Sequence, residues 1–154
     1  MKILKTFYLP YFLAFLLSVN AQCKKEHNKD PVNLTLYDKP LSVIQSNIHG
    51  KWKLHYGKGG ICASCIQYYN NVFWTFYPNN RIVQTDNNIS YTDTTINWIR
   101  DIGTFTNGSL TYIMNFYDKR GNPSNYVVDG ISNDTLILHD NSSDAVFYHF
   151  KKSN

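Results

Sequence analysis

Apolar and polar residues alternate along the chain from Gly50 almost to its C-terminal end. Residues 51–56 read Lys-Trp-Lys-Leu-His-Tyr, so an apolar side chain occupies every second position. This period is typical of a strand with one buried and one solvated face. The pattern predicts eight strands, which cover residues 51–56, 72–77, 81–85, 95–99, 109–117, 125–131, 135–139 and 145–151.

Short turns separate most of the predicted strands. Asn107-Gly108 is the clearest hairpin signal, because both residues accept the positive φ angles of a tight turn and the flanks, residues 103–106 and 109–117, are strand-like. No helical segment is long enough for a crossover connection, which excludes parallel pairing. The chain is therefore expected to be all-β, an antiparallel up-and-down eight-stranded barrel, with a β-sandwich as the alternative.

The region before the first predicted strand divides into two parts. Residues 23–40 are polar and contain Pro31 and Pro40, which is typical of a linker. Leu41, Ile44 and Ile48 follow at spacings of three and four, which predicts a short helical turn that Gly50 ends. Residues 41–152 provide enough chain for one hydrophobic core, so we expect a single β-barrel domain over that range.

The first 22 residues are typical of a secretory signal peptide. Lys2 and Lys5 precede an apolar run over residues 7–19. Cleavage after Ala21 is one expected outcome. The other makes Cys23 the lipid-modified first residue of the mature chain, which would anchor an exported protein to a membrane of the cell envelope. Because lipidation accounts for the odd cysteine, we favour it over a periplasmic or secreted protein without an anchor.

The charge of the chain argues against nucleic-acid binding. The formal net charge is +4, and loss of Lys2 and Lys5 with the leader would leave about +2. Basic residues are scattered among acidic ones, apart from the pairs Lys24-Lys25 and Lys151-Lys152. Nucleic-acid binding needs a concentrated basic stripe, so we expect no nucleic-acid partner. The sequence does not indicate a protein partner.

The order of these elements resembles a known family. Gly50-Lys51-Trp52 follows a helical turn and begins the first strand, like the Gly-x-Trp signature of lipocalins and related calycins. Together with residues 133–138 and 148–151, it resembles small lipocalin-like lipoproteins of Bacteroidota. The resemblance implies a barrel closed at one end by Gly50 and Trp52, with Lys151 packed across the tryptophan. The resemblance does not by itself identify a ligand.

The segment Cys62-Ala63-Ser64-Cys65 is the strongest candidate for sulfur chemistry. In an oxidising compartment these two cysteines are expected to form a disulfide that staples a loop. A thiol-redox role is the less favoured alternative, because no helix start or nearby cation would activate either thiol. A metal site is not expected, since no histidine pair has ligand spacing.

The aromatic residues are the main positive signal for function. Strand parity puts six of them, together with Met114, on the inner face of the barrel, as packed core or as an apolar cup. Arg100 lies near an open end and could meet an anionic ligand. The candidate ligand-binding residues are Tyr56, Trp74, Phe76, Trp98, Arg100, Tyr112, Met114 and Phe116.

Catalysis is not indicated. The turn aspartates are ordinary turn formers, and no Gly-x-Ser-x-Gly elbow occurs. We therefore expect a non-enzymatic protein without a cofactor that binds a small apolar or amphipathic ligand. The alternatives are an envelope interaction protein or inhibitor with a filled barrel, and a thiol-active protein that uses Cys62 and Cys65.

Overall fold

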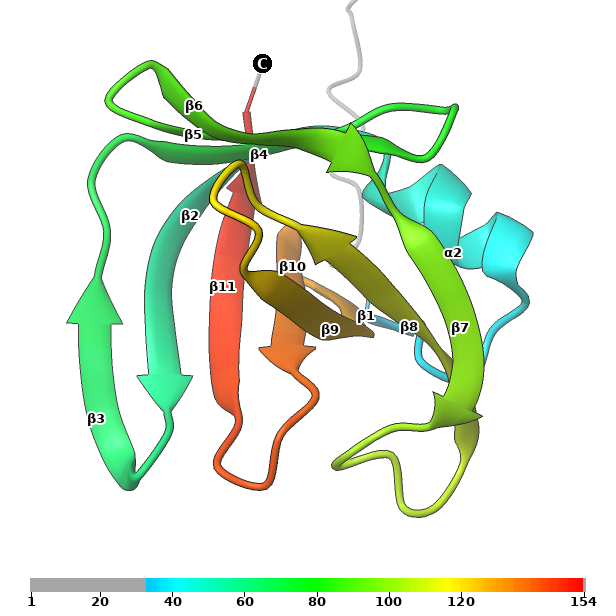
Figure 1. The fold of residues 1–154 in the computed structure, drawn as a ribbon. Coiled ribbons are helices and arrows are strands. Elements are labelled where there is room, and N and C mark those ends of the chain that lie inside the picture. Colours follow the sequence, from blue (N-terminus) through cyan, green and yellow to red (C-terminus); the bar gives the residue numbers. More distant parts are fainter. Residues whose placement is uncertain (1–32, 154) are drawn as a thin grey trace, which may run out of the picture. The chain divides into compact units, whose positions relative to one another are not determined.

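A computed structural model describes residues 33–153 of the chain (Figure 1). The expected signal peptide, Cys23 and the first part of the expected linker lie outside these residues. The described part consists mostly of antiparallel strands, with one short helix, α2 (Leu41–Ile48). Over residues 33–153, no helix has the length and apolar character needed to cross a membrane.

Eleven strands form one sheet. In chain order they are β1 (Asn33–Thr35), β2 (Gly50–Gly59), β3 (Cys62–Tyr68), β4 (Val72–Phe76), β5 (Arg81–Asp86), β6 (Ile89–Thr95), β7 (Asn97–Ile102), β8 (Leu110–Tyr117), β9 (Pro123–Ser132), β10 (Thr135–Asp140) and β11 (Val146–Lys152). The hydrogen-bonded order is β6-β5-β4-β2-β11-β10-β9-β8-β7, while β3 pairs with β2 and β1 pairs with β9.

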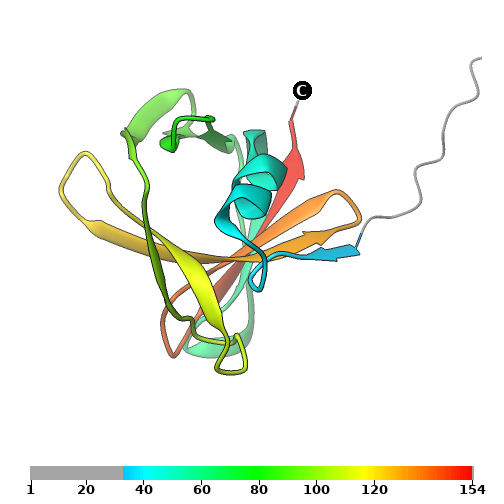
Figure 2. The same cartoon turned by 90° about the vertical axis from the view of Figure 1, so that its right-hand side faces the viewer.

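The sheet curls into a half-barrel that is open between β6 and β7 (Figures 1 and 2). These two strands end the hydrogen-bonded order, and only Ile96 separates them in the sequence. The expectation of an all-β, antiparallel fold is confirmed. The closed eight-stranded barrel is not confirmed, because the sheet has eleven strands and remains open.

Three strands were not expected from the sequence. Strand β3 lies where we expected a stapled loop, and β6 has only weak apolar alternation because threonine and serine fill it. Strand β1 lies within the expected linker and pairs with β9, and the next residue, Leu36, is fully buried. The prediction of a linker is therefore wrong for residues 33–36.

The Asn107-Gly108 turn forms, but one of its predicted flanks does not. Asn107 and Gly108 both have positive φ, at 52° and 75°, and Ser109 N–H donates to the Thr106 carbonyl at 2.9 Å. Strands β7 and β8 pair only as far as Ile102 and Leu110. Residues 103–106 instead form a loop whose Phe105 ring lies 5.5 Å from the Phe147 ring.

The inner face of the curled sheet carries the hydrophobic core. Helix α2 adds Ile44 and Ile48 to this core. Aromatic rings fill its centre, where Trp74 lies 5.0 Å from Phe150 between ring centroids. Removing these apolar surfaces from water is the main favourable contribution to folding. The strand residues of this core cluster that are fully buried are Ile82, Met114, Val128, Leu136, Leu138 and Phe150.

Trp52 is buried near the end of α2, where its indole Nε1–H donates to the Ile48 carbonyl at 2.6 Å. The basic side chain that packs across it is Lys152, with Nζ 4.4 Å from the ring centroid. The prediction for Lys151 is wrong, because Lys151 pairs with Lys53 and its Nζ donates to the Asn133 carbonyl. Gly50 has a φ of 111°, a backbone conformation that favours glycine.

We expect the two adjacent lysines to contribute differently to stability. Lys152→Met should lower the free energy of unfolding by about 0.5–1 kcal/mol, because it removes the cation–π contact with Trp52. Lys151→Met should change it by less than about 0.5 kcal/mol, as expected for an exposed residue. Urea unfolding measures both, and equal losses would contradict the assignment of Lys152.

Candidate functional site

A cavity of about 750 Å³ lies at one end of the curled sheet. Strands β2, β4, β6, β9 and β11 contribute lining residues, as do the turns that follow β5 and β8. Its apolar walls come from core-facing side chains, and its rim carries two acidic and two basic ones. The lining residues are Leu54, Tyr69, Val72, Trp74, Asp86, Asn87, Ile89, Ser90, Tyr91, Asp118, Lys119, Arg120, Tyr126 and Tyr148.

Trp74 lies at the centre of β4 and connects the cavity to the core. It pairs with Trp52 of β2 on one side and with Gln84 of β5 on the other. Only 4% of its surface is exposed. Its indole Nε1–H has no hydrogen-bond partner among the described residues. Trp74 is near enough to Tyr91 to lower the pKa of that phenol, although the two side chains do not complete a hydrogen bond.

Tyrosines form much of the remaining wall. Burial raises the pKa of Tyr91 and of Tyr148 to about 12, and it also raises the pKa of Tyr126 and of Tyr69. In each case removal from water disfavours the charged phenolate. Tyr91 reaches the cavity because it is the extra residue of a β-bulge between β5 and β6.

The turn between β8 and β9 forms one side of the rim. Lys119 ties this turn to β6, because its N–H donates to the Tyr91 carbonyl at 3.0 Å and its Nζ donates to the Ser90 carbonyl at 2.7 Å. Asp118 accepts bonds from the side chain and backbone of Asn122, which lower its pKa. The rim thus carries two acidic and two basic side chains, and their formal charges cancel.

Of the predicted ligand-binding residues, only Trp74 borders this cavity. Phe76, Met114 and Phe116 are buried in the core, and at most 3% of each is exposed. Trp98 and Tyr112 share their face and are partly buried against the core. Arg100 is exposed, with its guanidinium 5.9 Å from the Tyr112 ring.

Tyr56 lies on the outer face of the sheet, which corrects its predicted position. The β2–β11 register shifts after Leu54, so that His55 is an extra residue and Tyr56 pairs with the outward-facing His149. The Tyr56 and His149 rings stack 4.3 Å apart. Burial, followed by the charge of Lys58, lowers the pKa of His149. This stack borders a second cavity, of about 800 Å³.

A buried polar pair on the outer face holds the loop of residues 103–106. His139 is fully buried, and its Nδ1 lies 2.9 Å from the Asp129 carboxylate. Its Nε2 lies 2.8 Å from the Thr104 carbonyl. The imidazole ring thus contacts the carboxylate of β9 on one side and the loop carbonyl on the other. In residues 33–153, no three histidine, cysteine, aspartate or glutamate side chains are placed to hold a metal ion.

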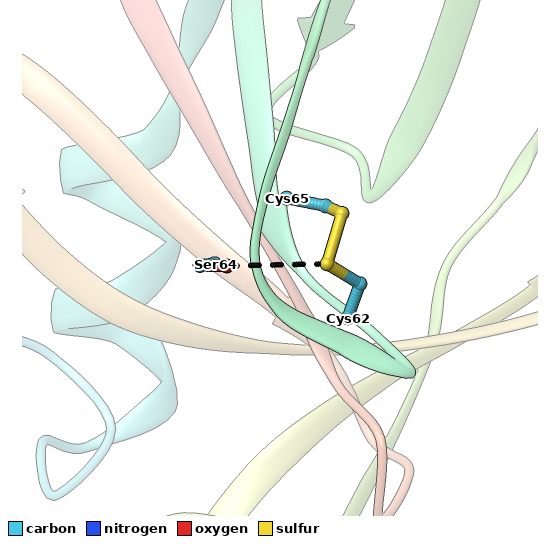
Figure 3. Close-up of a disulfide and its surroundings, with 3 residues drawn as sticks. All are labelled: Cys62, Ser64 and Cys65. Carbon is cyan, nitrogen blue, oxygen red and sulfur yellow. Dashed lines mark hydrogen bonds between the residues drawn. A yellow bond between two sulfur atoms is a disulfide. The ribbon is translucent and has the colours of Figure 1, made fainter.

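The predicted disulfide between Cys62 and Cys65 is confirmed, with a Cα–Cα distance of 5.3 Å (Figure 3). It lies in β3, whose side chains are all exposed. Pairing with β2 jumps from Cys62 to Ile66, and the disulfide spans the unpaired residues between them. Ser64 Oγ lies 4.0 Å from Cys62 Sγ. The disulfide is thus a staple of an irregular strand.

We expect the cavity tyrosines to resist ionisation. Between pH 10 and about 12 the unfolded chain loses phenol protons that the folded protein keeps, because burial raises the pKa of Tyr91 and Tyr148 to about 12. The free energy of unfolding should therefore fall as the pH rises through this range. Titration of phenolate absorbance, with urea unfolding at each pH, measures this. A titration midpoint near the ordinary pKa of about 10 for every tyrosine would contradict this prediction.

Most of the cavity wall was missed by sequence reasoning. Tyr126 and Tyr148 lie in predicted strands. Phe150 is two residues after Tyr148 in the same strand, so both side chains are on the inner face. Tyr69 and Tyr91 fall in segments for which no strand was predicted. Comparisons of the chain with protein-family models, with curated proteins and with solved structures find no match.

Proposed function

We propose that this chain is an exported, lipocalin-like protein that binds a small apolar or amphipathic ligand in the cavity beside Trp74. The observation that carries the proposal is the cavity itself, with a volume of about 750 Å³ and a wall rich in aromatic side chains. Small-molecule sites are typically apolar clefts of ~300–1,000 Å³ with a few well-placed polar groups. The tyrosine side chains of the wall carry such groups.

The cellular placement in the proposal rests on the sequence. A charged start, an apolar run and Cys23 support export followed by lipid attachment. A lipid at Cys23 would hold the domain at a membrane surface. Amphipathic molecules concentrate at that surface, so the anchor and the cavity suit the same type of ligand.

A titration with an uncharged fluorescent probe tests the proposal. N-phenyl-1-naphthylamine should bind the folded protein saturably, with increased emission. Val72 is 8% exposed and lines the cavity, so Val72→Phe should weaken binding about tenfold or more by filling the site. Val83 lies in the neighbouring strand β5, faces outward and does not line the cavity, so Val83→Phe is the matched control.

The control variant should bind the probe within about twofold of the unmodified protein. Circular dichroism and urea unfolding show whether each variant is folded. Absence of saturable binding to the folded, unmodified protein would overturn the proposal. Equal affinities of the two phenylalanine variants would also overturn it, because the probe would then bind elsewhere.

A second candidate function is an interaction protein, and β3 favours it. Ile61, Ile66 and Tyr68 are exposed by 96%, 47% and 75% on the β2–β3 hairpin. Among the described strands, β3 pairs only with β2, so its other edge is free. Free strand edges with apolar side chains are suited to pairing with another chain. A stoichiometric partner that Ile66→Asp loses, while probe binding persists, would favour this function.

A further inference from the structure

The second cavity, of about 800 Å³, lies on the outer face of the sheet. In β11, Phe147 and His149 line this cavity, whereas Tyr148 between them lines the cavity beside Trp74. The two cavities share none of the described residues, so one strand separates two independent spaces. The outer face of a one-sided antiparallel sheet is normally polar, and apolar side chains gathered there often mark a binding site.

Two pairs of aromatic rings line the second cavity. Tyr56 and His149 stack with their ring centroids 4.3 Å apart and their planes within 16°. Phe105 and Phe147 meet edge-on at 5.5 Å. All four side chains keep part of their surface accessible, and Phe105 is 57% exposed. Rings with free surface can take up a further ring in a stacked or edge-on contact.

Phe105 is held in a backbone conformation that a bulky residue rarely adopts. Its φ is 58°, in the left-handed region. Hydrogen bonds hold the residues on both sides, because Thr104 N–H donates to the Asn141 side chain and Thr106 Oγ1 donates to the Gly103 carbonyl, each at 2.7 Å. Burial of a ring that is 57% exposed offsets little of this strain. Such strain is concentrated at ligand-binding sites, which gives this phenylalanine a functional explanation.

Three connections between strands contribute to the wall of the second cavity. The loop of residues 103–106 contributes Phe105, the β2–β3 turn contributes Gly60 and Ile61, and the β10–β11 turn contributes Ser143 and Asp144. All three connections lie at the lower end of the ribbon in Figure 1. The volume of about 800 Å³ is within the range of ~300–1,000 Å³ that is typical of small-molecule sites. The cavity is therefore large enough for a molecule with fused rings.

The charges around the second cavity favour an uncharged ligand. Burial, followed by the charge of Lys58, lowers the pKa of His149 despite the opposing effect of Asp129. A cation beside this ring would be disfavoured for the same reasons. An anion would instead meet the carboxylates of Asp129 and Asp144, which also line the cavity. A neutral molecule avoids both repulsions.

We propose that the second cavity is a separate binding site for a flat, uncharged aromatic molecule. The rings of this ligand pack against Phe105 and against the stack of Tyr56 on His149. Phe105 is the residue that gives the site its preference for aromatic over saturated ligands, because the loop holds its ring in place. The inference goes beyond the proposed function, since it does not use the cavity beside Trp74.

A matched pair of probes tests the inference. 2-Naphthalenemethanol and decahydro-2-naphthalenemethanol have the same carbon skeleton and hydroxyl group, but only the first is flat and aromatic. Each is titrated into the protein while NMR follows the His149 imidazole protons, which are identified by their loss in His149→Gln. The aromatic alcohol should shift these protons saturably through its ring current. It should also bind about fivefold more tightly than the saturated alcohol, the ratio that an aromatic contact supports.

Two leucine variants assign the preference to Phe105. Phe105→Leu keeps an apolar side chain but removes the ring, so the affinities of the two alcohols should come within about twofold of each other. Phe73 lies on the outer face of β4 and does not line the second cavity, so Phe73→Leu should keep the preference. Urea unfolding shows whether each variant is folded. If Phe105→Leu does not fold, the two titrations of the unmodified protein still test the site.

The outcomes separate this inference from the proposed function. Val72→Phe fills the cavity beside Trp74 and should leave the response of His149 unchanged. Loss of the response in that variant would overturn the inference, because the alcohol would then bind in the first cavity. Absence of a saturable His149 shift, or equal affinities of the two alcohols for the unmodified protein, would also overturn it. The titration with N-phenyl-1-naphthylamine and Val72→Phe tests the proposed function separately.

Discussion

His139→Ala is expected to lower the free energy of unfolding by about 2–3 kcal/mol, the upper part of the range for leaving buried hydrogen-bonding groups without a partner. The upper part applies because His139 is completely buried and only 22% of the Asp129 side chain is exposed. The substitution removes the ring that contacts both the Asp129 carboxylate and the Thr104 carbonyl. The loop of residues 103–106 should also loosen, which amide hydrogen exchange would show.

His55→Ala is the matched control for His139→Ala. His55 is exposed at the bulge of β2, and its substitution should change the free energy of unfolding by less than about 0.5 kcal/mol. Urea unfolding compares the two variants under one condition. A loss below about 1 kcal/mol for His139→Ala would show that the pair contributes little beyond ordinary packing.

Phe150→Ala is expected to lower the free energy of unfolding by about 3–5 kcal/mol. Phe150 is fully buried in β11, where it pairs with Leu54 and packs on Trp74 at 5.0 Å. Truncation would leave a hole between the core and the cavity, and that hole would free the Trp74 ring. Thermal or urea unfolding measures the loss of stability, and tryptophan emission reports the environment of the ring.

Phe73→Ala provides the comparison for Phe150→Ala. Phe73 lies on β4 with its ring half-buried on the outer face, beneath Lys51 Nζ at 4.4 Å. Because much of the Phe73 surface already contacts water, Phe73→Ala should lower the free energy of unfolding by less than half as much as Phe150→Ala does. Similar losses for the two variants would contradict the assignment of Phe150 to the core.

The alternation of apolar and polar residues predicted the antiparallel strands well, because that pattern depends only on local geometry. It could not predict which side chains face inward beyond a bulge. One extra residue at His55 turns Tyr56 outward, and the β2–β11 register places Lys152 rather than Lys151 over Trp52. Such register shifts are set by pairing with a distant strand, so a single segment does not encode them.

The cavity was harder to predict than the core. Trp74, Phe76, Met114 and Phe116 share the inner face, as their parity indicated. Whether an inner-face residue meets a neighbour or a cavity depends on the curl of the sheet, which joins residues far apart in the chain. Tyr91 adds a second difficulty, because its strand is rich in threonine and serine and its position depends on a bulge.

The Asn107-Gly108 segment determines its own turn conformation but not the conformation of the residues that precede it. Its turn conformation follows from two residues that tolerate positive φ, and both adopt it. The preceding loop is instead held by His139 and Phe147, which are contributed by β10 and β11. Leu36 likewise became buried through contact with the sheet, although the sequence around it is polar and typical of a linker.

On the open side of the sheet, turn contacts and not strand pairs bound the interior. In a closed β-barrel, every strand is joined to both neighbours by backbone hydrogen bonds, and this pairing fixes the diameter. Across the opening, Lys119 links the β8–β9 turn to β6 with two bonds, to Tyr91 and Ser90. At this place the rim of the cavity is therefore held by the backbone N–H and the side chain of one residue, and not by a ladder between neighbouring strands.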